Sequence, residues 1–137
     1  VTPDGLAGSD YGKRICEIKL IDDATAIAAS AGNFSFCVPA ELNGYNLVGA
    51  QAFVTTQSTS GTPTFNVINV TDDHVMLSTA ITIDANNNEL TSYTAATAPV
   101  IDTNEDDVVT GDILKIYKTV AGTGEKGDGV ILTFQLP

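Results

Sequence analysis

The sequence has 137 residues, a length that suits one domain with a hydrophobic core of its own. Six basic residues stand against seventeen acidic ones, which gives a formal net charge of −11. A surface with this charge repels phosphate groups, so nucleic acid and anionic membrane surfaces are not expected partners. Apolar residues make up 43% of the chain, and its many Thr, Asn and Gly favour strands and tight turns.

The first twelve residues lack apolar periodicity and predict an extended arm, residues 1–12, ahead of a single domain, residues 13–137. An extended segment can join the sheet edge of a partner through backbone hydrogen bonds. We therefore expect the arm to be a docking element. Leu6 and Tyr11 would supply its apolar contacts, and Lys13 and Arg14 would pair with an acidic partner surface.

Two strands are predicted next, separated by a loop over residues 22–32. Cys16, Ile18 and Leu20 alternate with polar residues in the first strand, and residues 34–38 alternate in the second before a proline ends it. The two cysteines are expected to be free, half-buried thiols, which suits assembly in a reducing host cytoplasm.

The middle of the chain predicts a long hairpin that contains no charged side chain between Leu42 and Thr71. Residues 46–56 alternate with Val48, Ala50, Ala52 and Val54 on one side, and residues 60–63 turn the chain into a strand over 64–70. An exposed edge without charge normally needs cover. We expect a homo-oligomer, a trimer, to cover it; the alternative is burial inside one monomer.

The remaining segments complete an all-β domain. A shorter strand is predicted over residues 74–84, and two long antiparallel strands over 113–120 and 130–136 are joined by a glycine-rich hairpin connection. Seven or eight strands without a helical pattern predict an antiparallel β-sandwich of jelly-roll or immunoglobulin-like topology. Both topologies remain open at this point.

Residue types that carry catalysis are scarce. His74 is the only histidine, and neither G-x-S-x-G nor H-E-x-x-H occurs, so a hydrolase and a zinc site are not expected. The stretch 122–127 lacks the Gly-Lys-Ser/Thr of a phosphate loop, which argues against nucleotide binding. The sequence predicts a protein that is not an enzyme.

One acidic segment offers oxygen ligands at alternate positions, namely Asp102, Asn104, Asp106 and Asp107. A helix-loop-helix calcium motif is excluded, because Asp107 and Ile113 stand where it needs Gly and Glu. A different calcium site between β-loops is one hypothesis, and a solvated acidic loop is the alternative. No other cofactor is expected.

Three sequence segments occur in a fixed order along the chain: residues 41–48 (ELNGYNLV), 76–84 (MLSTAITID) and 100–112 (VIDTNEDDVVTGD). With them the chain resembles small virion structural proteins of tailed phages and prophages over residues 13–137. The resemblance implies a virion β-sandwich that decorates a capsid or forms the head of a fibre, and it brings no catalytic residue.

These observations together predict a capsid decoration or cement protein in the virion, bound in many copies to the major capsid protein. Two alternatives stay open. One is a fibre or receptor-binding head that contacts a host glycan, and the other is a secreted, calcium-assisted carbohydrate-binding module.

Overall fold

The structure is a computed structural model that describes residue 5 and residues 8–23, 33–85 and 89–137. No helix of this described part is long and apolar enough to cross a membrane. The elements are 3₁₀ turns and strands: η2 (Asp10–Gly12), β1 (Lys13–Lys19), β2 (Phe34–Cys37), η3 (Ala40–Leu42), β3 (Tyr45–Thr56), β4 (Thr64–Asn69), β5 (His74–Val75), β6 (Leu77–Thr79), β7 (Ile81–Thr82), η4 (Ser92–Thr94), β8 (Val100–Ile101), β9 (Asp107–Val108), β10 (Ile113–Val120) and β11 (Lys126–Gln135).

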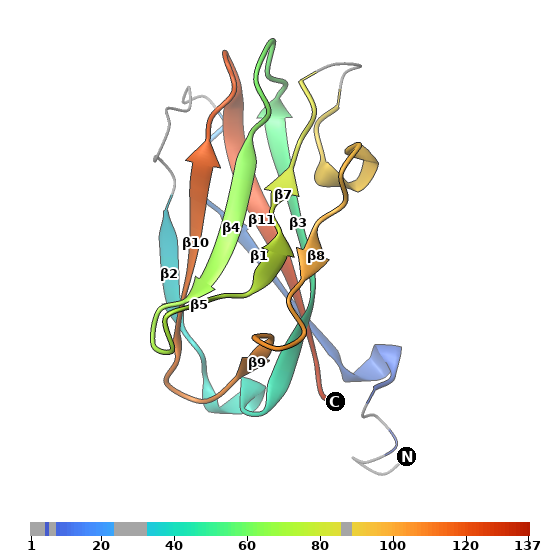
Figure 1. Ribbon diagram of the computed structural model, residues 1–137, viewed down its shortest axis with the longest axis vertical. Helices are drawn as coiled ribbons and strands as arrows, with labels where there is room; N and C mark the ends of the chain where they lie inside the picture. The colour runs from blue at the N-terminus through green and yellow to red at the C-terminus, as the bar shows by residue number, and fades with distance from the viewer. Residues whose placement is uncertain (1–4, 6–7, 24–32, 86–88) are drawn as a thin grey trace.

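Most strands form two facing antiparallel sheets, which confirms the predicted all-β sandwich, and β6 and β8 form a separate two-stranded sheet. One sheet has the order β1-β11-β3-β9, and the other has the order β2-β10-β4-β5, with β7 also paired to β4. Figure 1 shows β2, β10 and β4 side by side in front of β11 and β3. The chain alternates between the sheets, and this pairing pattern is that of a jelly roll rather than an immunoglobulin domain.

The core lies between the two sheets and is built from one face of each long strand. Its fully buried side chains include Leu47, Phe65, Leu114, Ile116 and Phe134. Each strand has one apolar face that must be covered. When the two sheets face each other, the apolar side chains of each sheet are covered by those of the other.

The two predicted long hairpins are wrong, because each one joins strands of different sheets. β3 pairs with β11, whereas β4 pairs with β10. The connections over residues 57–63 and 121–125 therefore cross from one sheet to the other, at the end of the sandwich drawn at the top of Figure 1. Because these connections run from one sheet to the other, the apolar faces of β3 and β4 pack against each other across the core. In a flat hairpin the two strands would lie in one sheet and their apolar faces would point the same way.

A β-bulge in β3 changes which side chains face the core. Gly49 pairs with Thr133 and Leu47 with Phe134, so Val48 is an extra residue without a partner in this ladder. Val48 is 42% exposed, while Leu47 is buried with Ala50. The prediction that Val48 shares a side of the strand with Ala50, Ala52 and Val54 is therefore wrong, because the bulge shifts the period of two by one residue.

The outer side of β3 is covered by the chain's own residues 90–106. Its backbone amides at Leu47, Ala52 and Val54 donate to Asp106 O (2.7 Å), Ser92 Oγ (2.8 Å) and Leu90 O (2.8 Å). The chargeless segment thus has no long exposed edge of the kind from which a trimer was expected. The oligomeric state stays a prediction, and this covering no longer supports it.

The predicted extended arm is not extended over its last residues. Gly8 N donates to Leu136 O at 2.8 Å, and Gln135 Nε2 donates to Ser9 O at 3.0 Å. The 3₁₀ turn η2 follows and leads into β1, next to the C-terminus in Figure 1. These backbone groups find partners at the end of β11, so residues 8–12 pack on the sandwich.

Candidate functional site

The four residues predicted to bind calcium do not form a preformed site. Asp102 Oδ1 accepts hydrogen bonds from Asn104 N (3.1 Å) and Asn104 Nδ2 (3.3 Å) and so closes a local turn. Asp106 is buried, whereas Asp107 is exposed in β9. The described residues contain no group of three or more His, Cys, Asp or Glu side chains placed to hold a metal. Calcium binding stays a prediction.

Part of the acidic segment is structural rather than solvated. Asp112 is 3% exposed, and its Oδ2 accepts hydrogen bonds from Asn69 Nδ2 and Val109 N, both at 3.0 Å. These bonds tie the end of β4 to the start of β10. The buried carboxylate of Asp112 is therefore itself satisfied by hydrogen bonds from the fold.

Asp106 is a second buried acid in this segment, at 9% exposure. Burial raises the pKa of Asp106 above its ordinary value of 3.8, and the charges of Asp107 and Asp102 raise it further, while hydrogen bonds from its own backbone and with the Asn46 side chain oppose the shift. A carboxyl whose pKa is higher in the folded protein stabilises the fold below its ordinary pKa, and this contribution is lost as the pH rises through the folded pKa.

We therefore expect Asp106→Asn to raise the free energy of unfolding at neutral pH relative to the wild type. The difference between the two proteins should grow as the pH rises from the ordinary aspartate pKa through the raised one, and then level off. Urea titrations from about pH 3 to about pH 7 measure it. A difference that shrinks as the pH rises would contradict the raised pKa.

The histidine and the two cysteines have separate surroundings in the described part of the chain. His74 is exposed, and its Nδ1 lies 3.5 Å from Glu105 Oε2. Both cysteines are free as predicted; Cys16 is half-buried, and Cys37 is more exposed than expected. Burial raises the pKa of the Cys16 thiol, which keeps it in the less nucleophilic protonated form.

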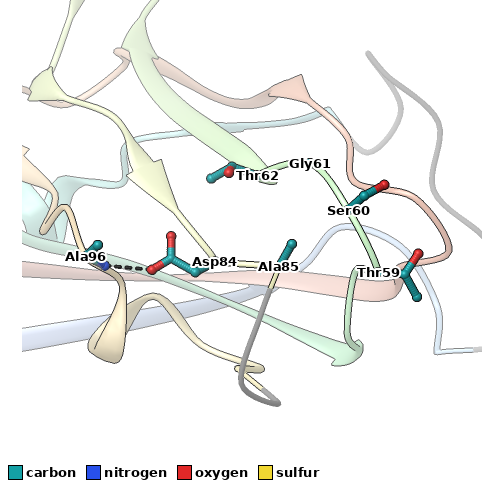
Figure 2. A pocket seen from close by; sticks show the side chains of 7 residues that line it. All are labelled: Thr59, Ser60, Gly61, Thr62, Asp84, Ala85 and Ala96. Atoms are coloured by element: carbon teal, nitrogen blue, oxygen red, sulfur yellow. Dashed lines mark hydrogen bonds between the residues drawn. The ribbon is translucent and has the colours of Figure 1, made fainter.

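An open hollow of about 480 Å³ lies at one end of the sandwich. Figure 2 shows Asp84 turned toward Ala96, whose backbone N–H donates to Asp84 Oδ2 at 2.7 Å. The carboxylate in the hollow is thus engaged by the protein itself. The described residues that line the hollow include no aromatic side chain to stack on a sugar ring; they are Thr59, Ser60, Gly61, Thr62, Asp84, Ala85 and Ala96.

The outer edge of β1 collects most of the residues predicted to form an interface. β1 is the first strand of its sheet, and no strand among the described residues pairs with its outer side. Tyr11 is 84% exposed and Ile15 is 71% exposed, and both Lys13 and Arg14 are exposed between them. We call these four residues the docking edge. Leu6, the remaining predicted interface residue, lies outside the described residues.

Charged groups within the docking edge are only weakly engaged by the fold. Lys13 Nζ lies 2.7 Å from Asp10 Oδ1 in an exposed ion pair, and Arg14 donates to the main-chain oxygen of Lys13 at 3.0 Å. Exposed ion pairs contribute little to stability. Both cations therefore remain accessible to a partner at small cost.

A cluster of buried charges lies between the sheets beside the connection from β10 to β11. The side chains of Lys118, Glu125 and Asp128 have 0% exposure. Lys118 Nζ bonds to Glu125 Oε1 and lies 3.1 Å from Asp128 Oδ2 and 4.8 Å from the centre of the Phe65 ring. We call these three charged residues the buried charge cluster.

The buried charge cluster is incompletely satisfied. Two carboxyl oxygens, Glu125 Oε2 and Asp128 Oδ1, are buried without a hydrogen-bond partner in the described part of the chain. Burial raises the pKa of Asp128, although Lys118 and Lys19 act to lower it. Unpaired buried oxygens are costly, so this arrangement calls for a chemical explanation.

Sequence reasoning missed the buried charge cluster, although a signal was present. Lys118 follows Leu114 and Ile116 at a spacing of two, which places it on the buried face of β10. Asp128 likewise precedes Val130 and Leu132 at a spacing of two on the buried face of β11. Opposite charges on two facing apolar strands predict a buried contact.

Comparison with protein-family models, with curated proteins and with solved structures found no match for this chain.

Proposed function

We propose that this chain is a non-enzymatic virion structural protein that decorates a phage head and docks on the major capsid protein through the docking edge. The observation that carries the proposal is the exposed, basic and partly apolar outer edge of β1 on an otherwise acidic protein. Three of the six basic residues, Lys13, Arg14 and Lys19, lie on this strand.

The chemistry of the docking edge favours an acidic protein surface as its partner. Complementary charge steers association and fixes the orientation of the two surfaces. An edge strand also offers free backbone groups that can accept a strand from a neighbour. An alternative explanation is that the lysine on this edge strand serves simply to prevent aggregation. That role does not account for the exposed Tyr11 and Ile15 beside it.

The fold is compatible with a role in the virion but is not itself evidence for that role. Jelly rolls are frequent in viral capsid and lectin domains, but one fold serves many functions. The hollow near Asp84 has no aromatic wall, so a glycan-binding head has less support from the described residues.

The test uses particles made by a phage or prophage from which the coding sequence of this chain has been deleted. Purified wild-type protein should bind these heads in many copies. The double variant Lys13→Glu/Arg14→Glu should bind at least about tenfold more weakly, the effect of losing roughly 1.4 kcal/mol of binding free energy. The wild-type affinity should also fall with added salt.

The matched control is Lys115→Glu, which reverses a partly exposed basic residue in the opposite sheet. It should bind as the wild type does. Equal binding by the double variant and the wild type would show that docking uses another face. A few copies confined to the tail would favour the fibre-head alternative.

A further inference from the structure

The buried charge cluster contains a primary amine and two carboxyl groups in direct contact, sealed from solvent. Lys118 reaches inward from β10, Asp128 reaches inward from β11, and Glu125 lies in the connection between these strands. Since β10 and β11 belong to different sheets, the cluster bridges the two layers of the sandwich. None of these groups takes part in the proposed docking.

We propose that Lys118 and Glu125 become joined by an amide bond that forms spontaneously within the folded protein, with Asp128 carrying the protons. Lys118 Nζ is the nucleophile, and it already contacts the Glu125 carboxyl group through Oε1. Asp128 Oδ2 lies 3.1 Å from the same nitrogen, within range for proton transfer.

The reaction is a condensation in which no group is oxidised or reduced. Lys118 passes one ammonium proton to Asp128, and the neutral amine attacks Cδ of Glu125. The new bond joins Nζ to Cδ, and the bond between Cδ and Oε2 breaks. Asp128 carries two protons in succession from Nζ to Oε2, which leaves as water. An amide and a water replace the ammonium and the carboxylate, so atoms and charge balance, and Asp128 is regenerated.

The site positions a donor where negative charge develops during the attack. Gly122 N donates a hydrogen bond to Glu125 Oε1 at 3.0 Å. This oxygen carries the charge of the tetrahedral intermediate, so the Gly122 amide acts as an oxyanion donor. The other oxygen of the carboxyl, Oε2, has no partner among the described residues and is the one that leaves.

The surroundings keep the reacting groups together and dry. A Cβ on Gly122 would lie 2.2 Å from Ser58 Oγ, so the connection between β10 and β11 packs directly on the connection between β3 and β4. Thr59 N donates to Thr123 O and Thr123 N donates to Ser60 O, both at 2.9 Å, which fastens the two connections together. Holding the reactants in contact removes much of the entropic barrier.

The product relieves the electrostatic cost of the cluster. Two carboxylates and one ammonium in an apolar interior leave one negative charge uncompensated and two oxygens unpaired. Condensation converts the Lys118–Glu125 ion pair into a neutral amide and removes the unpaired Oε2 altogether. A permanent ion pair would keep that cost, and the two states differ in covalent mass.

The deciding experiment is the intact mass of the purified, denatured wild-type chain. We expect a mass lower than that of the sequence by one water molecule. The full sequence mass after prolonged incubation of the folded protein would overturn the proposal. This outcome is independent of whether the chain binds capsids, so the two proposals fail separately.

Tryptic mapping identifies the bond. The amide blocks cleavage after Lys118, so the peptide 116–126 should remain one piece and lack one water. Water loss that instead joins this peptide to residues 127–137 would assign the bond to Asp128 and overturn the role of Glu125. Cleavage after Lys118 in the whole sample would overturn the proposal.

Three variants test the roles of the groups. Lys118→Arg keeps a cation without a primary amine, and Asp128→Asn keeps the side-chain shape but carries no proton between the groups. Both should show the full mass of their sequences. Lys115→Arg, a lysine change on the opposite face of the same strand, should still lose one water. Water loss by Asp128→Asn at the wild-type rate would contradict its role as proton carrier.

Discussion

Lys118→Met should lower the free energy of unfolding by about 3–5 kcal/mol, the usual cost of leaving a buried charged group without its partner, whether the wild type holds Lys118 and Glu125 as an ion pair or as the proposed amide. The substitution retains a flexible apolar side chain over the Phe65 ring but removes the nitrogen that contacts Glu125 and Asp128. Glu125 and Asp128 would then be two buried carboxyl groups without a counter-charge. Urea denaturation followed by circular dichroism measures the loss.

A compensated variant separates the charge effect from packing. Lys118→Met combined with Glu125→Gln and Asp128→Leu removes all three charges and keeps an acceptor for the Gly122 amide. Replacing a buried ionic group by uncharged residues of similar size is often nearly neutral, so most of the lost stability should return. If Lys118→Met alone unfolds at the same urea concentration as the wild type, the cluster is not a closed charge network.

Phe65→Ala should cost about 3–5 kcal/mol, because it removes a fully buried aromatic side chain from the core. Phe65 pairs with Lys118 across β4 and β10, with the ammonium 4.8 Å from the ring centre. The loss therefore combines a cavity with the lost contact between the ring and the Lys118 nitrogen, which is a cation–π contact in the ion-pair state. Thermal unfolding should show a lower melting temperature.

Phe34→Ala is the matched control, since it makes the same chemical change in β2 at a ring that is 41% exposed. It should cost under about 1 kcal/mol, because surface substitutions rarely exceed a few tenths. An equal loss for both variants would mean that the Phe65 ring contributes no more than an exposed one.

The sequence predicted where strands lie better than how they pair. Residues 113–120 were expected as a strand and form β10 with the same bounds, and the strand expected over 46–56 is β3 with one additional residue. Alternation reveals that a strand has an apolar face. It does not reveal which partner covers that face, so β3 and β4 were joined as a hairpin although they belong to opposite sheets.

The site was predicted only in part, for a related reason. Exposure of Tyr11, Lys13 and Arg14 follows from their position ahead of and within the first strand, and the structure places Lys13 and Arg14 on the edge strand β1 with Tyr11 in the turn before it. The buried charge cluster depends on two sheets meeting, so Lys118 and Asp128 come into contact only through the crossing topology. From the neighbouring sequence alone, a charged residue is expected to be exposed to solvent, because most charged residues are.

The pairing of β1 with β11 sets the order in which the chain can fold. Lys13 pairs with Gln135 and Lys19 with Gly129, so β1 lacks its partner among the described strands until β11 has left the ribosome. Contacts between residues so far apart in sequence close slowly, typically over roughly milliseconds to seconds in all-β domains. Refolding from urea should therefore be limited by the closure of this pair, while a nascent chain ending before residue 126 exposes both edges of β1 and the otherwise buried Ile18 to chaperones or to other chains.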